Sequence, residues 1–537
     1  MSIKIRIVLV FIVGLALGFR LYNVSDNPPA LSWDEVSIGY NAYSILKTGK
    51  DEHGRFLPID TFIAYGDYKP PLAIYITVPF VALFGLNELA VRLPSVIFGT
   101  LTVLLTYFLV TELFKHNGQE TIINVPLLSA ALLAISPWHI NLSRAGFEAT
   151  IALFFIVLGV VLCLAARGKE KLYWVCWLPF VAAVYTFNSA RYFVPLLALG
   201  LVVFIGKNVF LHKKNFLGGI ILSIVLLLPI FPHLFSKQAM LRFREVNIFS
   251  DSSPVITANN RIAREGNTFL SKVLNNRRVG YAYSMLTHYT DHFDPKFLFI
   301  RGDGNPKFST QDVGQLYLIE APLLVIGIIT LMLHAPKIAF FLLFWLLVSI
   351  VPAATARETP HALRILNSLP TWQIFIAYGL WVCMRKVRRV LVIVLVVIYV
   401  FQVSYYIYNY HTHYPRVYAS EWQYGYGQAI RYAKGAYDAY DHIFVTDRIG
   451  RPYMYTLFYT QYDPGLYLGQ KNSYFDAAGF YHVDGFAKYV FIKTLPSPIP
   501  PKSLIIGDPS WVGAGDHVLK EITYPDGTVA LVIYEHS

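Results

Sequence analysis

The sequence predicts a polytopic α-helical membrane protein that ends in a small α/β domain. Of its 537 residues, 55% are hydrophobic and only 15% are charged, and the mean hydropathy is +0.47. Soluble domains carry about 25% charged residues. Beyond residue 406 the long apolar runs give way to short strand-like segments. A single soluble globule is therefore excluded.

About eleven apolar runs are candidates for helices that cross a bilayer core of roughly 30 Å. The first has a basic start at Lys4 and Arg6 and ends without a clear cleavage site, which is typical of an uncleaved signal anchor. The run at 71–86 is short and contains Pro79, and we expect it to form an interfacial helix. The expected spans lie near residues 5–20, 92–114, 121–138, 148–166, 172–187, 192–206, 216–234, 315–333, 337–351, 369–384 and 387–406.

The distribution of basic residues predicts the orientation. If 71–86 stays outside, the short inside segments hold fourteen Lys and Arg residues and the short outside loops hold four, which obeys the positive-inside rule. The N-terminus is then cytoplasmic, in a plasma or inner membrane. Membrane anchoring also explains the net charge of +12 better than nucleic-acid binding does. The fourteen are Lys4, Arg6, Lys115, Arg167, Lys169, Lys171, Lys207, Lys213, Lys214, Lys337, Arg385, Lys386, Arg388 and Arg389.

This topology gives a transmembrane domain, 1–406, and an extracytoplasmic α/β domain, 407–537. The outside segments are a first loop at 21–91, a long loop at 235–314, a late loop at 352–368 and the C-terminal tail. In the tail, residues 443–447, 489–493 and 503–507 are typical of buried strands. We also expect a helix at about 421–435 and a hairpin over 522–534, around Asp526-Gly527.

Two acidic motifs lie in the first outside loop. Asp34 and Glu35 are adjacent carboxylates at the membrane surface, and their repulsion can prepare one of them for proton transfer. A pair of helix-capping residues is the alternative. Asp51, Glu52 and His53 offer ligands for a divalent metal ion, although a solvated turn that ends at Gly54 is the commoner arrangement.

Four arginines in the outside loops oppose the charge rule: Arg144, Arg191, Arg357 and Arg364. A bound phosphate would compensate them, because guanidinium groups hold phosphate oxygens in bidentate geometry. Ion pairs with Glu148 or Glu358, or snorkelling to lipid headgroups, would also do so.

Several motifs together resemble those of the GT-C glycosyltransferases of the protein O-mannosyltransferase and aminoarabinose transferase family. Asp34-Glu35 follows the first span, Lys69-Pro-Pro-Leu closes the first loop, and Arg92-Leu-Pro-Ser opens the next span. His361-Ala-Leu-Arg364, followed by Leu369-Pro370, is similar to the late outside loop of that family. The resemblance covers residues 1–406. Ser37 and Tyr68 depart from the pattern, because the aminoarabinose transferases usually have Arg and often an acidic residue there.

The resemblance implies an inverting transferase that takes a sugar from a polyprenyl-phosphate carrier outside the membrane. It implies that Asp34 is the catalytic carboxylate with Glu35 as its neighbour, and that Lys69 meets the donor phosphate, with Arg92 and Arg364 as further candidates. Arg144 is a further candidate because its charge opposes the topology rule. The acceptor would be a protein, a glycolipid or a polysaccharide. Weaker candidates for substrate contacts are Tyr68, His139, Asn188, Arg191, Arg357 and His361.

A transporter or flippase of a lipid-linked or anionic substrate is the alternative class. Transporters place ionisable and helix-breaking residues near the bilayer midplane. Here the spans are nearly free of charge and the polar motifs gather on one side. A scaffold protein would not explain four unfavourably placed arginines beside an acidic pair. The sequence therefore favours an enzyme.

Overall fold

The computed structural model describes residues 2–116, 124–166, 169–206, 212–234, 247–477, 479–513 and 515–536. Arg167, Lys207 and the first part of the long loop, 235–246, lie outside the described residues. The chain divides into two compact units. The first unit comprises Met1–Ala16, Gly99–Leu142 and Ala149–Tyr406, and the second comprises Leu17–Phe98, Ser143–Glu148 and Ile407–Ser537. The second unit thus takes the whole tail together with the first outside loop, and the expected division into 1–406 and 407–537 stays a prediction.

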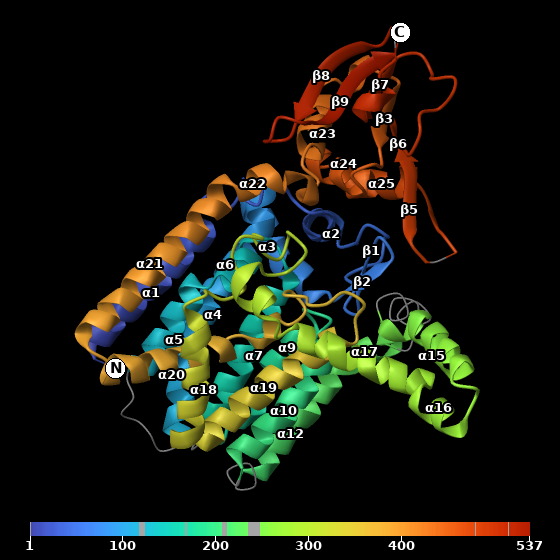
Figure 1. The fold of residues 1–537 in the computed structure, drawn as a ribbon. Helices are drawn as coiled ribbons and strands as arrows, with labels where there is room; N and C mark the ends of the chain where they lie inside the picture. Colours follow the sequence, from blue (N-terminus) through green and yellow to red (C-terminus); the bar gives the residue numbers. More distant parts are fainter. Residues whose placement is uncertain are drawn as a thin grey trace. The chain divides into compact units, whose positions relative to one another are not determined.

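The first unit is helical. Helices α18, α19 and α20 pack on one another, with α10 against α19 and α5 against α20 (Figure 1). A Cβ atom on Gly327 of α18 would lie 1.8 Å from the carbonyl oxygen of Phe375, so the α18 and α20 backbones touch. The helices that lie wholly or partly in this unit are α1 (Ile3–Leu21), α4 (Glu88–His116), α5 (Asn124–Ile135), α6 (Pro137–Arg144), α7 (Glu148–Ala165), α8 (Leu172–Val175), α9 (Leu178–Val184), α10 (Ala190–Ile205), α12 (Lys213–Leu227), α13 (Phe231–Leu234), α15 (Ser253–Arg264), α16 (Phe269–Leu274), α17 (Arg277–Asp291), α18 (Glu320–His334), α19 (Pro336–Ala354), α20 (Thr371–Lys386) and α21 (Arg389–Thr412).

Among the described residues, five helices are long and apolar enough to cross a membrane, or six if the bent pair Asn124–Ile135 and Pro137–Arg144 is one span. The expected number of about eleven is not confirmed, because several predicted runs form helices of only 10–17 residues. The protein covers little of the last long helix, since only 11% of its apolar window is buried. An uncovered apolar surface of this size is typical of a helix that faces lipid. The five are Glu88–Lys115, Glu148–Ala165, Lys213–His233, Pro336–Ala354 and Arg389–Val417.

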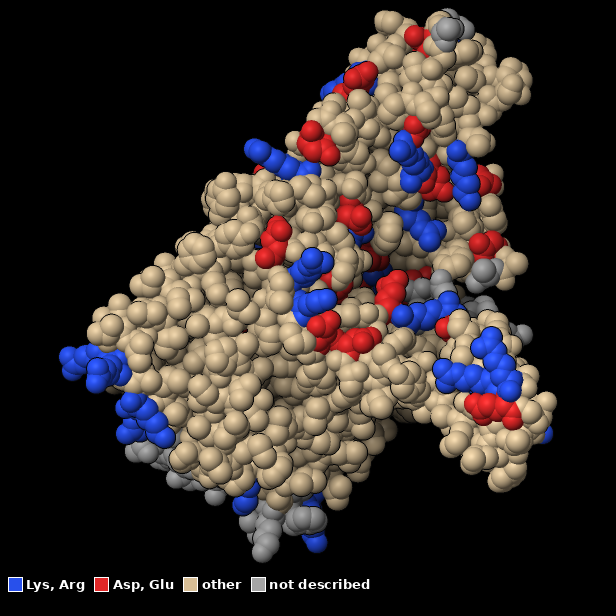
Figure 2. All heavy atoms as spheres, in the orientation of Figure 1, with Lys and Arg blue, Asp and Glu red and all other residues tan. Residues whose placement is uncertain are grey.

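Charged side chains are distributed unevenly over the first unit. Its helical surface is almost bare of charge, and blue side chains gather at the lower left rim of the view (Figure 2). The sequence places basic pairs at the start of α1 (Lys4, Arg6) and α12 (Lys213, Lys214) and at the end of α20 (Arg385, Lys386). Such a belt between polar ends is what a bilayer-embedded surface presents.

The tail of the second unit forms a seven-stranded mixed sheet in the order β4-β5-β6-β3-β7-β9-β8, in which β3 runs parallel to β6 and β7. The three expected strands, the hairpin and the helix near 421–435 are confirmed. Strands β4 and β5 were not expected. The elements of the tail are α22 (Tyr414–Val417), α23 (Tyr426–Gly435), β3 (His442–Thr446), α24 (Pro452–Thr460), α25 (Pro464–Gln470), β4 (Asn472–Phe475), β5 (Tyr481–Phe486), β6 (Tyr489–Ile492), β7 (Ser503–Gly507), β8 (His517–Thr523) and β9 (Val529–His536).

The first outside loop shares one hydrophobic core with the tail. Val36 and Tyr40 of α2 (Trp33–Thr48) are buried in the same cluster as Ile443 of β3 and Tyr453 of α24. The loop also contains the hairpin β1 (Phe62–Ala64) and β2 (Asp67–Lys69) and the helix α3 (Leu72–Phe84). At 1.5 Å per residue, α3 is about 20 Å long and too short for the roughly 30 Å of a bilayer core. Its interfacial position stays a prediction.

Candidate active site

Glu35 fixes the start of α2. Its carboxylate accepts the main-chain N–H of Ser32 at 2.9 Å, and the Ser32 hydroxyl accepts the N–H of Glu35 at 3.4 Å, which is a capping box. The other oxygen, Oε1, accepts from Arg92 Nε and from the Gly146 N–H, each at 2.9 Å. The side chain is fully buried. The capping alternative therefore applies to Glu35, and we call Ser32, Glu35, Arg92 and Gly146 the Glu35 cluster.

Arg92 and Arg144 are fully buried and donate mainly to main-chain carbonyls. Their guanidinium groups together contact eight carbonyl oxygens of residues 19–30, which form the last turn of α1 and the segment that leads to α2. These carbonyls belong to Val24, Ser25, Pro28 and Ala30 for Arg92, and to Phe19, Arg20, Asn23 and Asn27 for Arg144. Because carbonyl oxygens occupy these N–H donors, the contacts favour a structural role for both arginines over the expected contact with a donor phosphate.

Asp34 lies in different surroundings. Lys69 Nζ is 2.9 Å from Asp34 Oδ1 and 2.9 Å from Glu148 Oε1, and we call these three residues the Asp34 cluster. The Lys69 and Glu148 side chains are only 8% and 10% exposed, whereas that of Asp34 is 37% exposed. Burial lowers the pKa of Lys69, but the two carboxylates outweigh it and hold that pKa above its ordinary value. Lys69 therefore stays protonated beside an accessible carboxylate.

A tight hairpin brings Lys69 to Asp34. Tyr65 and Gly66 both have positive φ angles, 60° and 94°, which suits the two-residue turn between β1 and β2. The Tyr65 hydroxyl donates to the carbonyl of Trp33 at 2.7 Å and ties this turn to the first residue of α2. Tyr68 is half-buried beside Lys69.

Glu148 was not among the expected site residues. The sequence offered it only as an ion-pair partner of one of the outside arginines, but it pairs with Lys69. It stands in the first turn of α7, a helix that is otherwise apolar. An isolated acid at the end of a membrane span is a signal that could have identified it.

Asp51, Glu52 and His53 have separate partners. Asp51 Oδ1 accepts the N–H groups of His53 and Arg55 at 3.0 and 2.8 Å, and Gly54 has φ 86°, so the segment forms a turn, but Asp51 and Glu52 are buried and not solvated. Glu52 Oε1 accepts from Asn41 at 3.1 Å, and burial raises the Glu52 pKa to about 8. Burial lowers the pKa of His53 to about 4. Within the described ranges, no three His, Cys, Asp or Glu residues are grouped to hold a metal ion.

In the first unit, the long loop holds the late loop in place. The Ala362 N–H donates to Asp303 Oδ2 at 2.6 Å, and the His361 N–H lies 3.2 Å from His292 Nε2. His292 Nδ1 lies 2.8 Å from the His288 carbonyl oxygen and donates to it, so Nε2 is the acceptor. Burial raises the pKa of Asp303 to about 6 and lowers that of His361. Arg364 is half-buried, three residues beyond His361.

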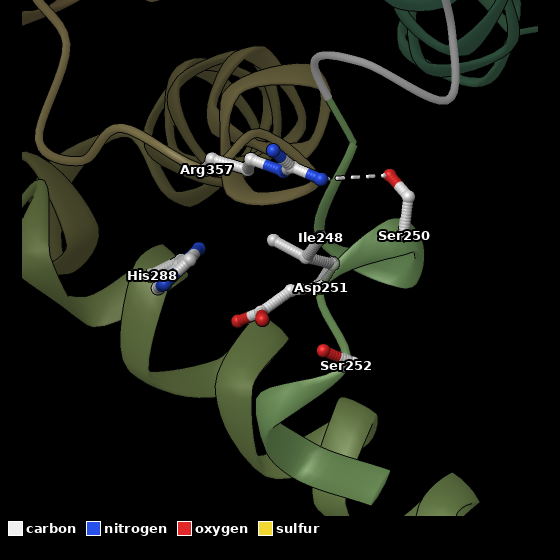
Figure 3. Close-up of a pocket in the computed structure, with 6 residues that line it drawn as sticks. All are labelled: Ile248, Ser250, Asp251, Ser252, His288 and Arg357. Atoms are coloured by element: carbon white, nitrogen blue, oxygen red, sulfur yellow. Dashed lines mark hydrogen bonds between the residues drawn. The ribbon is translucent and has the colours of Figure 1, made fainter.

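Arg357 belongs to a separate pocket of the first unit. The pocket has a volume of about 420 Å³, and Arg357 donates to Ser250 Oγ at 3.3 Å across it (Figure 3). It is lined by Ile248, Ser250, Asp251, Ser252, His288 and Arg357.

The other expected substrate contacts lie elsewhere in the first unit. His139 is buried in α6, and the neighbouring Trp138 donates to the Ala362 carbonyl at 3.2 Å. Asn188 is exposed just before α10, and Arg191 is half-buried in its first turn. Their roles in substrate binding stay predictions.

Comparisons with known proteins give a family match for part of the chain and a fold match for most of it. Residues 68–233 match the dolichyl-phosphate-mannose-protein mannosyltransferase family. A putative mannosyltransferase of Bacillus subtilis, YycA, is 27% identical over 160 residues, which are 30% of this chain and 22% of that protein. The chain thus spans less than a quarter of that relative's length.

Two solved structures are similar over most of the chain. ArnT from Cupriavidus metallidurans bound to undecaprenyl phosphate has a TM-score of 0.50 and 13% identity, with 84% of each chain covered. The oligosaccharyltransferase AglB from Archaeoglobus fulgidus, in complex with an inhibitory peptide and a dolichol-phosphate, has a TM-score of 0.50 and 12% identity, with 90% of this chain and 74% of that chain covered. At this identity the likeness concerns the fold.

Proposed function

We propose that this chain is a GT-C glycosyltransferase and that it transfers a sugar from a polyprenyl-phosphate carrier to an acceptor hydroxyl, with inversion at the anomeric carbon. The reaction takes place at the outer face of the membrane. The sugar is a hexose or a pentose, and the acceptor is a protein, a glycolipid or a polysaccharide.

The exposure of Asp34 carries this proposal. A general base must reach the hydroxyl proton it removes, within about 3 Å. The described contacts of Glu35 occupy both of its oxygens, and Glu148 is nearly buried. Asp34 is the most exposed of the three, and Lys69 contacts its Oδ1. We assign the acceptor proton to the Asp34 carboxylate.

In the proposed reaction the acceptor oxygen attacks the anomeric carbon of the donor. The bond between that carbon and the phosphate oxygen breaks, and the electron pair leaves with the polyprenyl phosphate. The acceptor proton moves to Asp34. The leaving group needs little assistance once cations neutralise its charge, so the step requires only a base for the acceptor proton. A carboxylate can serve as that base.

Lys69 serves both partners of the reaction. An ammonium group has three N–H donors, and the contacts with Asp34 and Glu148 use two of them. The third donor is assigned to a phosphate oxygen of the donor. Arg364 of the late loop is a second proposed phosphate ligand.

Incubation of the purified protein in nanodiscs with a panel of radiolabelled polyprenyl-phosphate sugars tests the function. Transfer to an acceptor, or slow hydrolysis of one donor, is the expected result, and the donor that reacts identifies the sugar. Movement of an intact lipid-linked sugar across a proteoliposome membrane, with no cleavage of any donor, would instead indicate a flippase and overturn the proposal.

The proposed orientation is tested by labelling cysteines in intact cells with an impermeant thiol reagent. With Cys383 replaced by Ser, Asp60→Cys in the first loop and Gln470→Cys in the tail should both react. Arg388→Cys, on the proposed cytoplasmic side, should react only after lysis. Labelling of only one of the first two would mean that 71–86 crosses the membrane.

A further inference from the structure

The tail contributes a loop to the surroundings of Asp34. Residues 447–451 follow the carboxyl end of β3, which lies between two parallel neighbours in the sheet. Ligands of α/β sheets bind outside the carboxyl ends of such strands. A Cβ atom on Gly450 would lie 3.7 Å from the Trp33 ring, and Tyr455 donates to the carbonyl of Leu31 at 2.9 Å. The loop is therefore packed against the residue that precedes Asp34.

Arg451 occupies an unusual position in this loop. Its φ angle of 60° places the backbone in the left-handed region, which residues other than glycine seldom adopt and which clusters at functional sites. Its guanidinium carbon lies 4.8 Å from the centre of the Tyr65 ring. Tyr65 in turn donates to the Trp33 carbonyl. The ring thus holds a cation close to Asp34, and the charges of both residues act on the Tyr65 hydroxyl.

The guanidinium group of Arg451 is uncommitted in the part of the chain that the structure describes. The main-chain N–H of Arg451 donates to the Asp447 carboxylate at 3.2 Å, but its side chain forms only the contact with the Tyr65 ring. Arg92 and Arg144 differ, because carbonyl oxygens occupy their guanidinium groups. Arg451 is also half-exposed, so its N–H donors are accessible to a ligand.

The charge of the Asp34 cluster shows which ligand these donors suit. With both carboxylates ionised, Asp34, Glu148 and Lys69 sum to one negative charge, which repels a phosphate. A second cation is needed to neutralise the leaving group. On the basis of the proposed function, we infer that Arg451 binds the phosphate of the lipid-linked donor, so that the C-terminal tail completes the active site.

The test measures binding of two lipids to the full-length protein in nanodiscs: undecaprenyl phosphate and the matching alcohol, which lacks the phosphate. Arg451→Gly suits the left-handed backbone and removes only the side chain. It should weaken binding of the phosphate at least about tenfold and leave binding of the alcohol unchanged. Arg451→Lys should recover part of the loss, because it restores the charge without the fork.

Arg448→Ala is the matched control, since Arg448 lies in the same loop, is 58% exposed and pairs with Asp508. It should bind both lipids like the wild type. Equal loss of affinity for phosphate and alcohol in Arg451→Gly would overturn the inference, and so would unchanged phosphate affinity with a raised KM for the acceptor. Failure of the proposed function would look different, because the wild-type protein would then cleave no donor in the transfer assay, whatever the affinities of the two lipids.

Discussion

Asp34 and Glu35 are neighbours in the sequence, but they stand in contrasting surroundings at the start of α2. The Glu35 cluster is buried, and its carboxylate accepts hydrogen bonds from a guanidinium group and from two main-chain N–H groups. The Asp34 cluster is partly open, and its lysine is shared between two carboxylates. A buried residue with a complete set of hydrogen bonds holds the site in shape, whereas an exposed carboxylate beside it is accessible to a substrate.

Replacement of Asp34 should have the largest effect. Asp34→Asn keeps the shape and removes the basicity, so transfer should fall by roughly 10²–10⁴-fold while donor affinity stays close to wild type. Glu35→Gln is the paired variant, and it should act mainly on thermal stability. If Glu35→Gln abolishes transfer in a folded protein while Asp34→Asn does not, the two roles must be exchanged.

Loss of Arg92 should destabilise the Glu35 cluster. Arg92→Ala leaves Glu35 buried without its cation and frees four carbonyls, which should cost about 3–5 kcal/mol of unfolding free energy. A thermal melt in detergent measures this, and the exposed pair of Arg448 and Asp508 provides the control, for which about 0–1 kcal/mol is expected. A normal melting temperature with weakened donor binding would instead indicate that Arg92 binds the donor phosphate.

Loss of Lys69 should weaken donor binding at the Asp34 cluster. Lys69→Ala removes a phosphate ligand, and donor affinity should fall by roughly ten- to a hundredfold. Arg364→Ala should do the same if the late loop also reaches the phosphate. Unchanged donor affinity in both variants would remove these residues from the site.

Replacement of Asp303 should have the smallest effect. Its carboxylate is buried like that of Glu35, but it accepts hydrogen bonds from the main-chain N–H groups of Asn305 and Ala362. Its pKa is raised from 3.8 to about 6. The folded state therefore holds the proton more tightly, and stability should fall by roughly 1–3 kcal/mol as the pH rises from about 4 to about 6. Melting curves of Asp303→Asn should lack this component. An identical pH dependence in both proteins would contradict it.

The sequence predicted much of this arrangement, because motifs at span ends and strand periodicity are local signals. The Asp34 and Lys69 motifs do come together, and the strands of the tail are where the pattern placed them. The roles of Arg92 and Glu148 could not be derived in the same way. Whether an arginine faces a phosphate or its own backbone depends on segments far away in the sequence. The span count is not confirmed for a related reason, since hydropathy does not reveal where a run breaks into short helices.

The eight carbonyls held by Arg92 and Arg144 have a consequence for the order of biogenesis. The segment at 19–30 emerges from the ribosome early, but its most distant donor, Arg144, lies 125 residues beyond its partner Phe19. At roughly 5–20 residues per second, synthesis of that stretch takes about 6–25 s. During this interval the exit from α1 lacks its donors. The start of α2, and with it Asp34, can therefore reach its final position only after Arg144 and Gly146 have been synthesised.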